Sequence, residues 1–560
     1  MSELKRIKEQ FDDMKALRSN WDSMYQVLGE YISQIKQNFE GKPANGEFLQ
    51  DDIFDSSGTF AAHNSASALL GMLWGGSAKQ TIEILQPEGL EESTEIEEFY
   101  ENMSNNLIEA MDDPKANLSL ALDEYMLDQM IFGTSGVGVE LGEESDLEYT
   151  SYSVTELYLD EGKSGRVNKI ALYYEWDAAR VIAEYGEENV SEKVRKCVEQ
   201  GKKEKVKILV MIQPRKEKKA EKGRLAMPYE CIHMEYADLK LLREEGFNEL
   251  PIPIARFRKL AYEKYGRSLG MNALPDIKEL NIMREAGIIA SEKGLDMPLG
   301  VYNDGILGGG YLDTSPRAVN VFNQVSSGSQ TPVFEIGERP DMRYAQARYE
   351  ELRESISQHF GIDRLLDFNN DTQMTFGEAQ IRDNARLKSL LGLFARQISE
   401  LFTPLIERSI NIKWRRGDFG VVRGSEEEKE QIELGRDVTY IPDAIADLLS
   451  EGKQVYKIGY KTAAKQASRA EQYISIVDVL QIVGQAAQFD PSVLNRIDMH
   501  EAIKVMAEIR SLPVGIIRQD DEVAEIEDQQ QQQTQTQQML DTMQQGANIA
   551  NTVADAESKL

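Results

Sequence analysis

Cysteine and long apolar runs are both scarce in this sequence. The chain has 560 residues and two cysteines, Cys197 and Cys231, which is too few for a disulfide framework and does not give a zinc-finger spacing. No stretch approaches the roughly 18 uninterrupted apolar residues of a transmembrane helix. The opening residues, MSELKRIKEQFDDMK, are charged and lack the apolar region of a secretory signal. We therefore expect a soluble protein with no membrane anchor, made in a reducing cytoplasm.

Positive charge is also in short supply. The chain contains 63 Lys and Arg residues against 95 Asp and Glu residues, which gives a net charge of −32. A chain with this balance repels DNA rather than wrapping it, so a non-specific nucleic-acid binder is excluded. A conduit benefits from the same charge, because a duplex that must slide should not adhere to the wall. The alternative is that the acidity only confers solubility.

Motifs for catalysis are missing as well. The sequence contains no G-x-S-x-G, H-E-x-x-H or Walker A motif. Residues 162–164, Gly-Lys-Ser, resemble the end of a Walker A loop, but the glycine required five residues earlier is Leu157, so a hairpin turn is the better interpretation. The glycine cluster at 133–138 follows a helix and has no lysine with it, which favours a tight turn into a strand over a phosphate site.

A metal site is not supported either. Four histidines are scattered along the chain, and only His233 has neighbours of ligand type, since Cys231 and Glu235 would share one face of a strand with it. No second cluster completes a tetrahedral site, so cross-strand packing is the better interpretation of His233. We predict no metal, no cofactor and no catalytic residue, and hence a protein that is not an enzyme.

The stretch from Asp341 to Arg416 organises the rest of the chain. Apolar or small residues first recur at steps of three and four, which predicts a helix with one apolar face that ends at Gly361. The residues of that face are Met342, Ala345, Tyr349, Leu352, Ile356 and Phe360. A polar turn follows, and Thr375 with Glu378 has the spacing of a capping box at the start of a second helix.

This second helix has no convincing stop before Gly417 and would span roughly 60 Å. Its length suggests a coiled coil, a membrane span or a scaffold inside an assembly. Charged residues interrupt it too often for a membrane span, and no heptad pattern continues through it. Pro404 predicts a kink. A long kinked helix within a larger assembly remains.

Upstream, helical spacing predicts a series of helices before a strand-rich region. They cover Leu4 to about Gln37, Ser57 to about Gly75, Thr94 to Met111, Leu118 to Phe132, and later Met271 to Lys293. Thr94 and Glu97 have capping-box spacing. Strands are expected around 134–139, 157–160, 167–176, 205–214, 229–236 and 456–460, with short helices at 177–185 and 191–200. The basic run at 215–219 is interpreted as a solvated loop.

Several of these segments together resemble one protein family. The segment MTFGEAQIRDNARLKSLLGLFARQISELFTPLIERSI (374–410), preceded by YAQARYEELRESISQHFGIDRL (344–365), looks like the tunnel-loop and wing-helix region of podovirus-type bacteriophage portal proteins, the head-to-tail connectors. YGRSLGMNALPDIKELN (265–281) resembles the first stem helix of that family. RSNWDSMYQVLGEYI (18–32) and IFDSSGTFAAHNSASALLGMLW (53–74) resemble its opening helices, and the matches, with FGTSGVGVE between them, are in the family's order over about residues 15–415.

The resemblance implies a mixed α/β, helix-dominated fold with wing, stem, clip and crown. The implied parts are a wing at 1–264, a first stem helix at 265–297, a clip at 298–340, a second stem helix at 341–361, a tunnel loop at 362–374, the kinked long helix and the rest of the wing at 375–460, a crown at 461–515, and a Gln-rich tail at 516–560 that is partly ordered or forms a barrel helix. The residues alone indicate only that a small α/β module is inserted between two helices.

The tunnel loop holds the residues that we expect to face the channel. Four of them, Asn369, Asn370, Thr372 and Gln373, are polar and uncharged, so they can form short-lived hydrogen bonds to phosphate without strong trapping. Asp367 begins this stretch. Arg364 can offer phosphate a positive charge, or it can pair with a neighbouring aspartate. The alternative is that the segment is merely a solvated turn.

The resemblance also implies function and partners. Members form a closed ring of about twelve subunits with heterologous interfaces at one capsid vertex of the virion. Double-stranded DNA enters through the ring, driven by a separate terminase, and leaves through it at infection, while tail adaptors and capsid and scaffolding proteins contact the ring. Two alternatives stay open: an acidic assembly scaffold or tail adaptor without DNA passage, and a nucleotide-dependent enzyme that uses the 133–138 loop.

Overall fold

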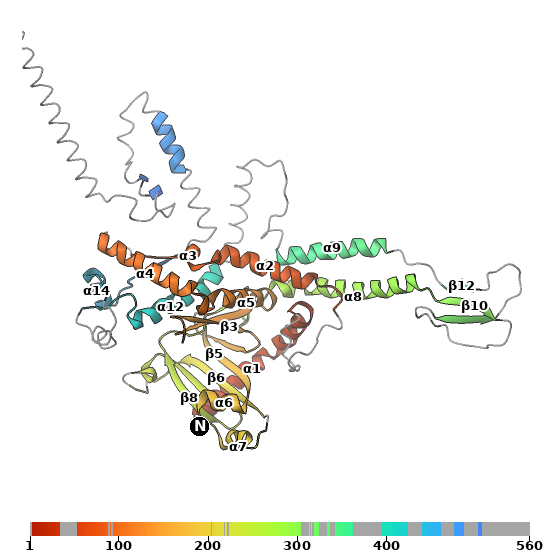
Figure 1. The fold of residues 1–560 in the computed structure, drawn as a ribbon, viewed down its shortest axis with the longest axis horizontal. Helices are drawn as coiled ribbons and strands as arrows, with labels where there is room; N and C mark the ends of the chain where they lie inside the picture. The colour runs from red at the N-terminus through yellow and green to blue at the C-terminus, as the bar shows by residue number, and fades with distance from the viewer. Residues whose placement is uncertain are drawn as a thin grey trace, which may run out of the picture. The chain divides into compact units, whose positions relative to one another are not determined.

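The computed structural model describes most of the first 460 residues and short pieces beyond them. The described residues are 3–33, 53–87, 90, 93–202, 204–217, 219–220, 223–303, 313, 315, 318–323, 333–336, 342–361, 395–423, 439–460, 475–485, 502–503 and 505–506. The chain divides into two compact units, Met1–Ala464 and Lys465–Leu560. In the second unit residues 475–485 are helical. The first unit mixes helices and strands, as expected (Figure 1).

The N-terminal helices form where the apolar spacing predicts them. They are α1 (Glu3–Leu28) with a π-helical turn η1 (Gly29–Ser33), α2 (Ser57–Trp74), α3 (Ala78–Thr81), α4 (Thr94–Asp112), the 3₁₀ turn η2 (Pro114–Ala116) and α5 (Leu118–Ile131). The prediction of the capping box of α4 placed the N-cap one residue too late, at Thr94. Ser93 is the N-cap, and its side chain accepts a hydrogen bond from the Ile96 amide, because its extended backbone places the hydroxyl over the first turn.

A five-stranded antiparallel sheet contains most of the strand-rich region. Its order is β4 (Leu157–Glu161), β5 (Val167–Asp177), β6 (Lys205–Pro214), β7 (Tyr229–Glu235) and β8 (Lys240–Phe247). The short helices α6 (Ala178–Tyr185) and α7 (Glu192–Glu199) lie between β5 and β6, and the 3₁₀ turn η3 (Arg224–Ala226) precedes β7. The predicted hairpin at 157–176 is confirmed as β4 and β5. Ile7, Phe11 and Met14 of α1 pack on this sheet.

The basic run after β6 is not a simple solvated loop, because Arg215 is buried. Its guanidinium is 2% exposed and contacts Glu244 of β8 at 3.1 Å. It also donates hydrogen bonds to the carbonyls of Met227 and Glu245. The apolar strand before it gave no sign of this role, since the acidic partner comes from another strand.

Two smaller sheets complete the region around the helices. One has the order β3 (Glu148–Ser153), β2 (Thr134–Glu140) and β9 (Ile254–Arg256), all antiparallel. The other joins β1 (Ile82–Leu85) to β13 (Lys457–Tyr460), with Ile84 opposite Ile458. Strand β13 was predicted, whereas β1 was not, because four residues carry little periodic signal and its partner lies far along the chain.

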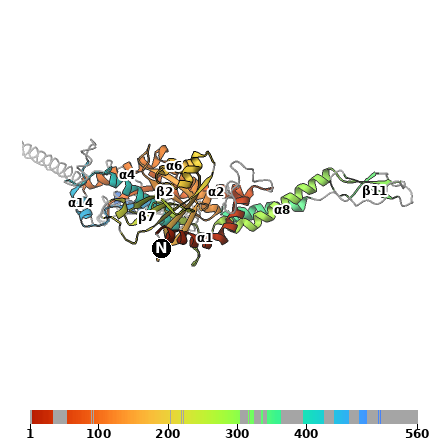
Figure 2. The ribbon, with the colours of Figure 1, turned by 90° about the horizontal axis from the view of Figure 1, so that it is seen from below.

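The second half of the first unit begins with a long helix. The elements are α8 (Leu269–Leu295), the strands β10 (Leu299–Asn303), β11 (Val319–Asn323) and β12 (Val333–Glu335), α9 (Arg343–Phe360), a π-helical turn η4 (Ile398–Phe402), α12 (Thr403–Arg416) and α14 (Asp443–Ser450). Strand β10 pairs in parallel with β11 and antiparallel with β12. In Figure 2 α8 lies beside α2 and leads into the strands that include β11. Among the described residues no helix is both long and apolar enough to cross a membrane.

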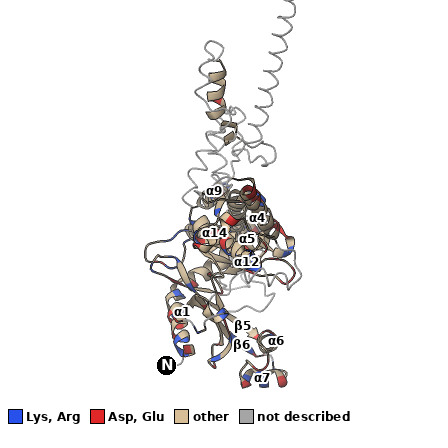
Figure 3. Ribbon diagram, turned by 90° about the vertical axis from the view of Figure 1, so that its left-hand side faces the viewer, with Lys and Arg blue, Asp and Glu red and all other residues tan. Residues whose placement is uncertain are grey.

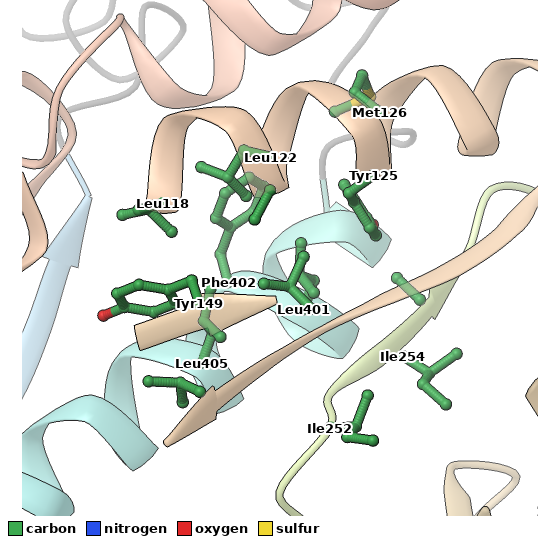
Figure 4. Packing of buried hydrophobic residues seen from close by; sticks show 14 of the residues in the cluster. Leu118, Leu122, Tyr125, Met126, Tyr149, Ile252, Ile254, Leu401, Phe402 and Leu405 are labelled. Atoms are coloured by element: carbon green, nitrogen blue, oxygen red, sulfur yellow. The ribbon is translucent and has the colours of Figure 1, made fainter. Parts of the chain in front are cut away.

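The main core joins the first helices to elements from much later in the chain. Leu118, Leu122 and Tyr125 of α5 face Leu401 and Leu405 of η4 and α12 across the small sheet (Figure 4). Outside the core, Lys and Arg residues occur alongside Asp and Glu residues on the same elements, including α1 and α7 (Figure 3). Because they pack against α5, η4 and α12 are structural parts of the N-terminal region although they come much later in the chain.

Candidate functional site: the helix pair and the junction behind it

The helices α8 and α9 pack side by side and run in opposite directions. Arg348 contacts Glu279 at 2.8 Å, and further along α9 Ser355 donates a hydrogen bond of 2.6 Å to Asp276, which comes earlier in α8. The interface is apolar where the helices touch. Its buried residues are Ala273, Ile277 and Leu280 of α8, and Tyr349, Leu352, Ile356 and Phe360 of α9. Two helices that bracket an inserted strand module are thus locked together along their length (Figure 1).

One close contact sets how near the two helices approach. The Tyr349 hydroxyl donates a hydrogen bond of 2.9 Å to the carbonyl of Met283. A Cβ added at Gly287 would meet that hydroxyl, so the position has no room for a side chain. The close packing of the two helices therefore requires that Gly287 has no side chain.

Asp55 fixes the start of α2 to both helices. It is 5% exposed and contacts Arg353 of α9 at 2.6 Å and Arg284 of α8 at 3.6 Å. Burial raises the pKa of this carboxyl, but the hydrogen bonds from Ser57 and Arg353 outweigh that effect, and the net pKa is lowered. The amide of Phe54 donates to Asn281 at 2.7 Å. The helix pair is thereby attached to the N-terminal helices by charged and polar contacts.

The end of α9 is fixed by one hydrogen bond and one glycine. The Phe360 side chain is fully buried, and its carbonyl accepts a hydrogen bond of 2.8 Å from Ser65 of α2. Gly361 adopts a left-handed conformation at φ 70° and closes the helix with its amide, as its predicted role as a stop requires. The chain leaves this point into the predicted tunnel loop.

The predicted tunnel-loop residues lie outside the described part of the chain. These are Arg364, Asp367, Asn369, Asn370, Thr372 and Gln373, and the expected capping box at Thr375 and Glu378 lies there too. Their role stays a prediction. Residues 395–416 are the described part of the predicted long helix.

The irregularity predicted from Pro404 occurs as a π-helical turn. Residues 398–402 form η4, and Pro404 stands in the first turn of α12. Proline cannot donate the hydrogen bond to the carbonyl four residues before it, and its ring would collide with that carbonyl, so a wider turn relieves both problems. The Phe402 ring stacks on Trp74 of α2 at 5.5 Å, and Gln397 accepts a hydrogen bond from Tyr125 of α5.

Buried basic residues fix α12 to loops of the strand region. Arg408 donates 2.8 Å to the carbonyl of Val139, and Lys413, 2% exposed, contacts Asp146 at 2.7 Å and Asp418 at 3.2 Å. Burial opposes ionisation of Asp146, but Lys413 and Arg416 outweigh it and lower the pKa. This helix cannot shift without breaking ion pairs whose basic side chains are buried.

The glycine cluster cannot hold a phosphate. Gly133 forms a turn at φ 78°, and a Cβ on Gly136 would lie 2.9 Å from the Pro253 carbonyl. Both glycines pack closely against other segments of the same polypeptide. This agrees with the predicted tight turn into a strand. The Gly162 amide donates 2.9 Å to the Arg166 carbonyl, which confirms the predicted hairpin turn there.

His233 contacts neighbouring side chains of the five-stranded sheet and of α6. Its Nδ1 lies 2.9 Å from the Tyr185 hydroxyl and its Nε2 lies 3.3 Å from Cys231 Sγ. Burial and the nearby charge of Arg243 lower the pKa of His233 to about 4. No group of three potential metal ligands occurs in the described ranges.

Both cysteines are buried free thiols. Cys197 lies 3.0 Å from a carboxylate oxygen of Glu204, and this hydrogen bond raises the pKa of the thiol. Burial raises the pKa of Cys231. Neither residue offers a reactive thiolate at its surface.

The burial of several basic side chains, among them Arg18 and Arg256, was not predicted from the sequence. Arg18 of α1 is 3% exposed and donates to the carbonyls of Val154 and Leu157. Arg256 of β9 is completely buried. For Arg256 a signal existed, because it is a charged residue inside the apolar run PIPIARF. Its partners come from distant segments and could not be read from the sequence.

Comparisons with known proteins show that the sequence of this chain is similar to those of phage proteins. A family model described as bacteriophage head to tail connecting protein matches residues 4–517. The chain is 23% identical over 562 residues to a "Probable portal protein" of Bordetella phage BPP-1, covering 98% of this chain and 95% of the relative. It is 22% identical over 567 residues to the "Portal protein" of Salmonella phage epsilon15, covering 100% of this chain and 96% of that protein.

Proposed function

This chain belongs to the bacteriophage head to tail connecting protein family, and from that membership we propose that it is the subunit of a portal ring at one vertex of the phage capsid. The observation that carries the proposal is the near full-length match to two portal proteins. A match that covers the whole chain brings every segment into the comparison, so no large part needs a separate explanation. Such a protein is a structural component of the virion.

We assign the described elements to the parts of a portal as follows. The α8 and α9 pair is the stem, the strands β10 to β12 belong to the clip, and η4 with α12 is the outer part of the wing helix. What supports this assignment is the order along the chain, in which an inserted strand module stands between two antiparallel helices. The crown remains assigned to residues 461–515, most of which belong to the second compact unit, Lys465–Leu560.

The ring provides a channel for double-stranded DNA. A separate terminase drives the DNA inward, and the same channel releases it at infection, while tail adaptors, the major capsid protein and scaffolding proteins dock on the ring. The chain is made in the host cytoplasm and hydrolyses nothing itself. The net charge of −32 supports passage, because a negative wall repels the phosphate backbone and lets a duplex slide.

The channel-facing residues remain those of the predicted tunnel loop. Asn369, Asn370, Thr372 and Gln373 would form brief hydrogen bonds to phosphate, with Arg364 and Asp367 at the start of the loop. The attachment of Phe360 to Ser65 supports this assignment, because a loop that contacts moving DNA needs a fixed point of departure.

The mass and shape of the purified protein test the function, and a deletion tests the loop. We expect native mass spectrometry and negative-stain microscopy to show a ring of about twelve subunits with an axial hole. A compact dimer or tetramer would instead favour an adaptor or an enzyme. The variant that lacks Asn369 to Gln373 should form the same rings but retain less packaged DNA, because it loses the phosphate contacts. Normal retention in rings of the deleted variant would remove the role of the loop.

A further inference from the structure

Arg256 lies at the centre of a buried and completely satisfied hydrogen-bond group. Its side chain is 0% exposed, and every one of its donors has an acceptor. Nε and Nη2 bind both carboxylate oxygens of Glu400 at 3.2 and 2.9 Å. Nη1 binds Glu161 and the Lys264 carbonyl, and Nη2 also binds the Gly165 carbonyl at 2.9 Å. A guanidinium has five N–H donors, and five bonds use them all.

These contacts join three segments that are far apart in the chain. Glu400 lies in η4, Glu161 ends β4, and Lys264 precedes α8. The backbone amide of Arg256 also donates 3.1 Å to Glu400, so that carboxylate is held by the side chain and the main chain of one residue. Lys259 contacts Glu161 at 2.6 Å and Arg396 contacts Glu400 at 2.7 Å, so each of the two carboxylates pairs with a second cation as well as with Arg256.

The bidentate contact depends on the π-helical turn. A π turn holds one more residue than a regular turn, so the helix before η4 is offset by one residue from α12. If η4 became regular α-helix, Glu400, which lies inside the turn, would rotate by about 50° relative to α12, roughly half of the one-residue offset. Its carboxylate would then point away from Arg256. The fork geometry of the guanidinium therefore matches one register of the helix and not the other.

We propose that Arg256, acting through Glu400, is the positioning residue that fixes the register with which the chain enters α12. This inference rests on the proposed portal function for its consequence, because the chain that enters η4 comes from the predicted tunnel loop. The fixed end on the far side is α12, where Lys413 and Arg408 are buried in ion pairs. A register held at one point on a fixed helix gives every subunit of a ring the same geometry.

The first experiment measures amide hydrogen exchange in the full chain carrying Arg256→Lys or Glu400→Gln. Lysine keeps the charge but cannot form the fork, and glutamine keeps the shape but loses one acceptor and the charge. We expect amides of residues 395–402 to exchange at least about tenfold faster in both variants, while β6 and the C-terminal half of α12 keep their protection. Arg415→Lys is the matched control, because Arg415 forms a similar pair with Glu249 at an exposed position.

The result that overturns the proposal is equally specific. A uniform rise in exchange over the whole first unit would show that Arg256 only stabilises the fold, and unchanged exchange at 395–402 would show that it fixes nothing. If Arg256→Lys does not fold, Glu400→Gln and Glu400→Asp decide the question, since both leave the buried guanidinium in place. Glu400→Asp keeps the charge but shortens the side chain, so rescue of protection by aspartate would also count against the fork.

A second measurement separates this inference from the portal proposal. In variants that assemble, we expect rings of unchanged subunit number that retain less packaged DNA than the wild type. If those rings retained as much DNA as the wild type while the amides of residues 395–402 exchanged fast, the register of η4 would have no role in DNA retention. If the wild-type chain forms no ring at all, the portal proposal fails, whereas hydrogen exchange on the unassembled chain still decides whether Arg256 fixes η4.

Discussion

The imidazole of His233 makes the folding stability of the protein depend on pH. Its pKa is lowered from 6.5 to about 4 by burial and by Arg243, so the folded protein keeps it neutral while the unfolded chain protonates it below about pH 6.5. The unfolded state therefore binds more protons between these values, and stability falls as pH falls from about 6.5 to about 4. The full difference corresponds to about 3 kcal/mol at 1.36 kcal/mol per unit.

Replacing this histidine should remove that loss. We expect His233→Gln to flatten the dependence of unfolding free energy on pH between about 6.5 and about 4, measured by urea unfolding with tryptophan fluorescence. The substitution His63→Gln on the exposed face of α2 should leave the dependence as in the wild type. An unchanged slope in the His233 variant would assign the acid sensitivity to other groups.

At the residue scale, the sequence predicts turns and helix ends better than it predicts the burial of charged side chains. Gly133, Gly361 and the 162–166 turn have the roles that their local patterns indicate. Arg215 and Arg256 do not reveal theirs, because the carboxylates that stabilise them come from other strands and helices. A side chain's burial is decided by the whole fold, and a local pattern does not contain it. The predicted tunnel-loop residues stay untested for a different reason, since they lie outside the described ranges.

At the scale of elements, the contact between α8 and α9 is a point where one methyl group decides the packing. A Cβ at Gly287 would meet the Tyr349 hydroxyl. We expect Gly287→Ala to lower the free energy of unfolding by about 1 to 3 kcal/mol, because overpacking forces Tyr349 away from Met283. Chemical unfolding measures the change. Adding Tyr349→Phe should recover part of it, since the hydroxyl is then gone.

A matched substitution shows whether the cost comes from space. Gly71 lies in α2, and no atom lies within 4 Å of the position that an added methyl group would take there. Gly71→Ala should therefore be neutral or stabilising by up to about 1 kcal/mol, as alanine favours helix over glycine. Equal losses in both variants would mean that the α8 and α9 contact is looser than the structure shows.

Elements with strong periodicity are the predictable part of this fold. The helices α2, α4, α5, α8 and α9 begin and end within a few residues of the predicted positions, because each carries apolar residues at helical spacing. Strand β1 has four residues and becomes a strand only by pairing with β13. The irregularity at η4 was predicted from Pro404, whereas the contacts of this turn with Arg256 and Trp74 come from distant segments that the helix sequence does not contain.

At the scale of the whole molecule, charge opposes assembly. Each chain carries a net charge of −32, so subunits brought together in a ring repel one another. Raising the ionic strength from about 0.1 M to about 1 M shortens the Debye length from about 10 Å to about 3 Å and screens this repulsion. We expect the fraction of chain in rings, measured by mass photometry, to rise with salt. A fall would show instead that ion pairs between subunits hold the ring.

The two buried thiols have a consequence for durability. Oxidation in air and cross-linking between neighbouring chains both begin from an accessible thiolate. Cys197 and Cys231 are buried and their pKa values are raised, so neither supplies one. A phage particle outside its host has no cellular reducing system to repair oxidised cysteines. The burial and the raised pKa values of both thiols thus protect the connector from oxidation and cross-linking.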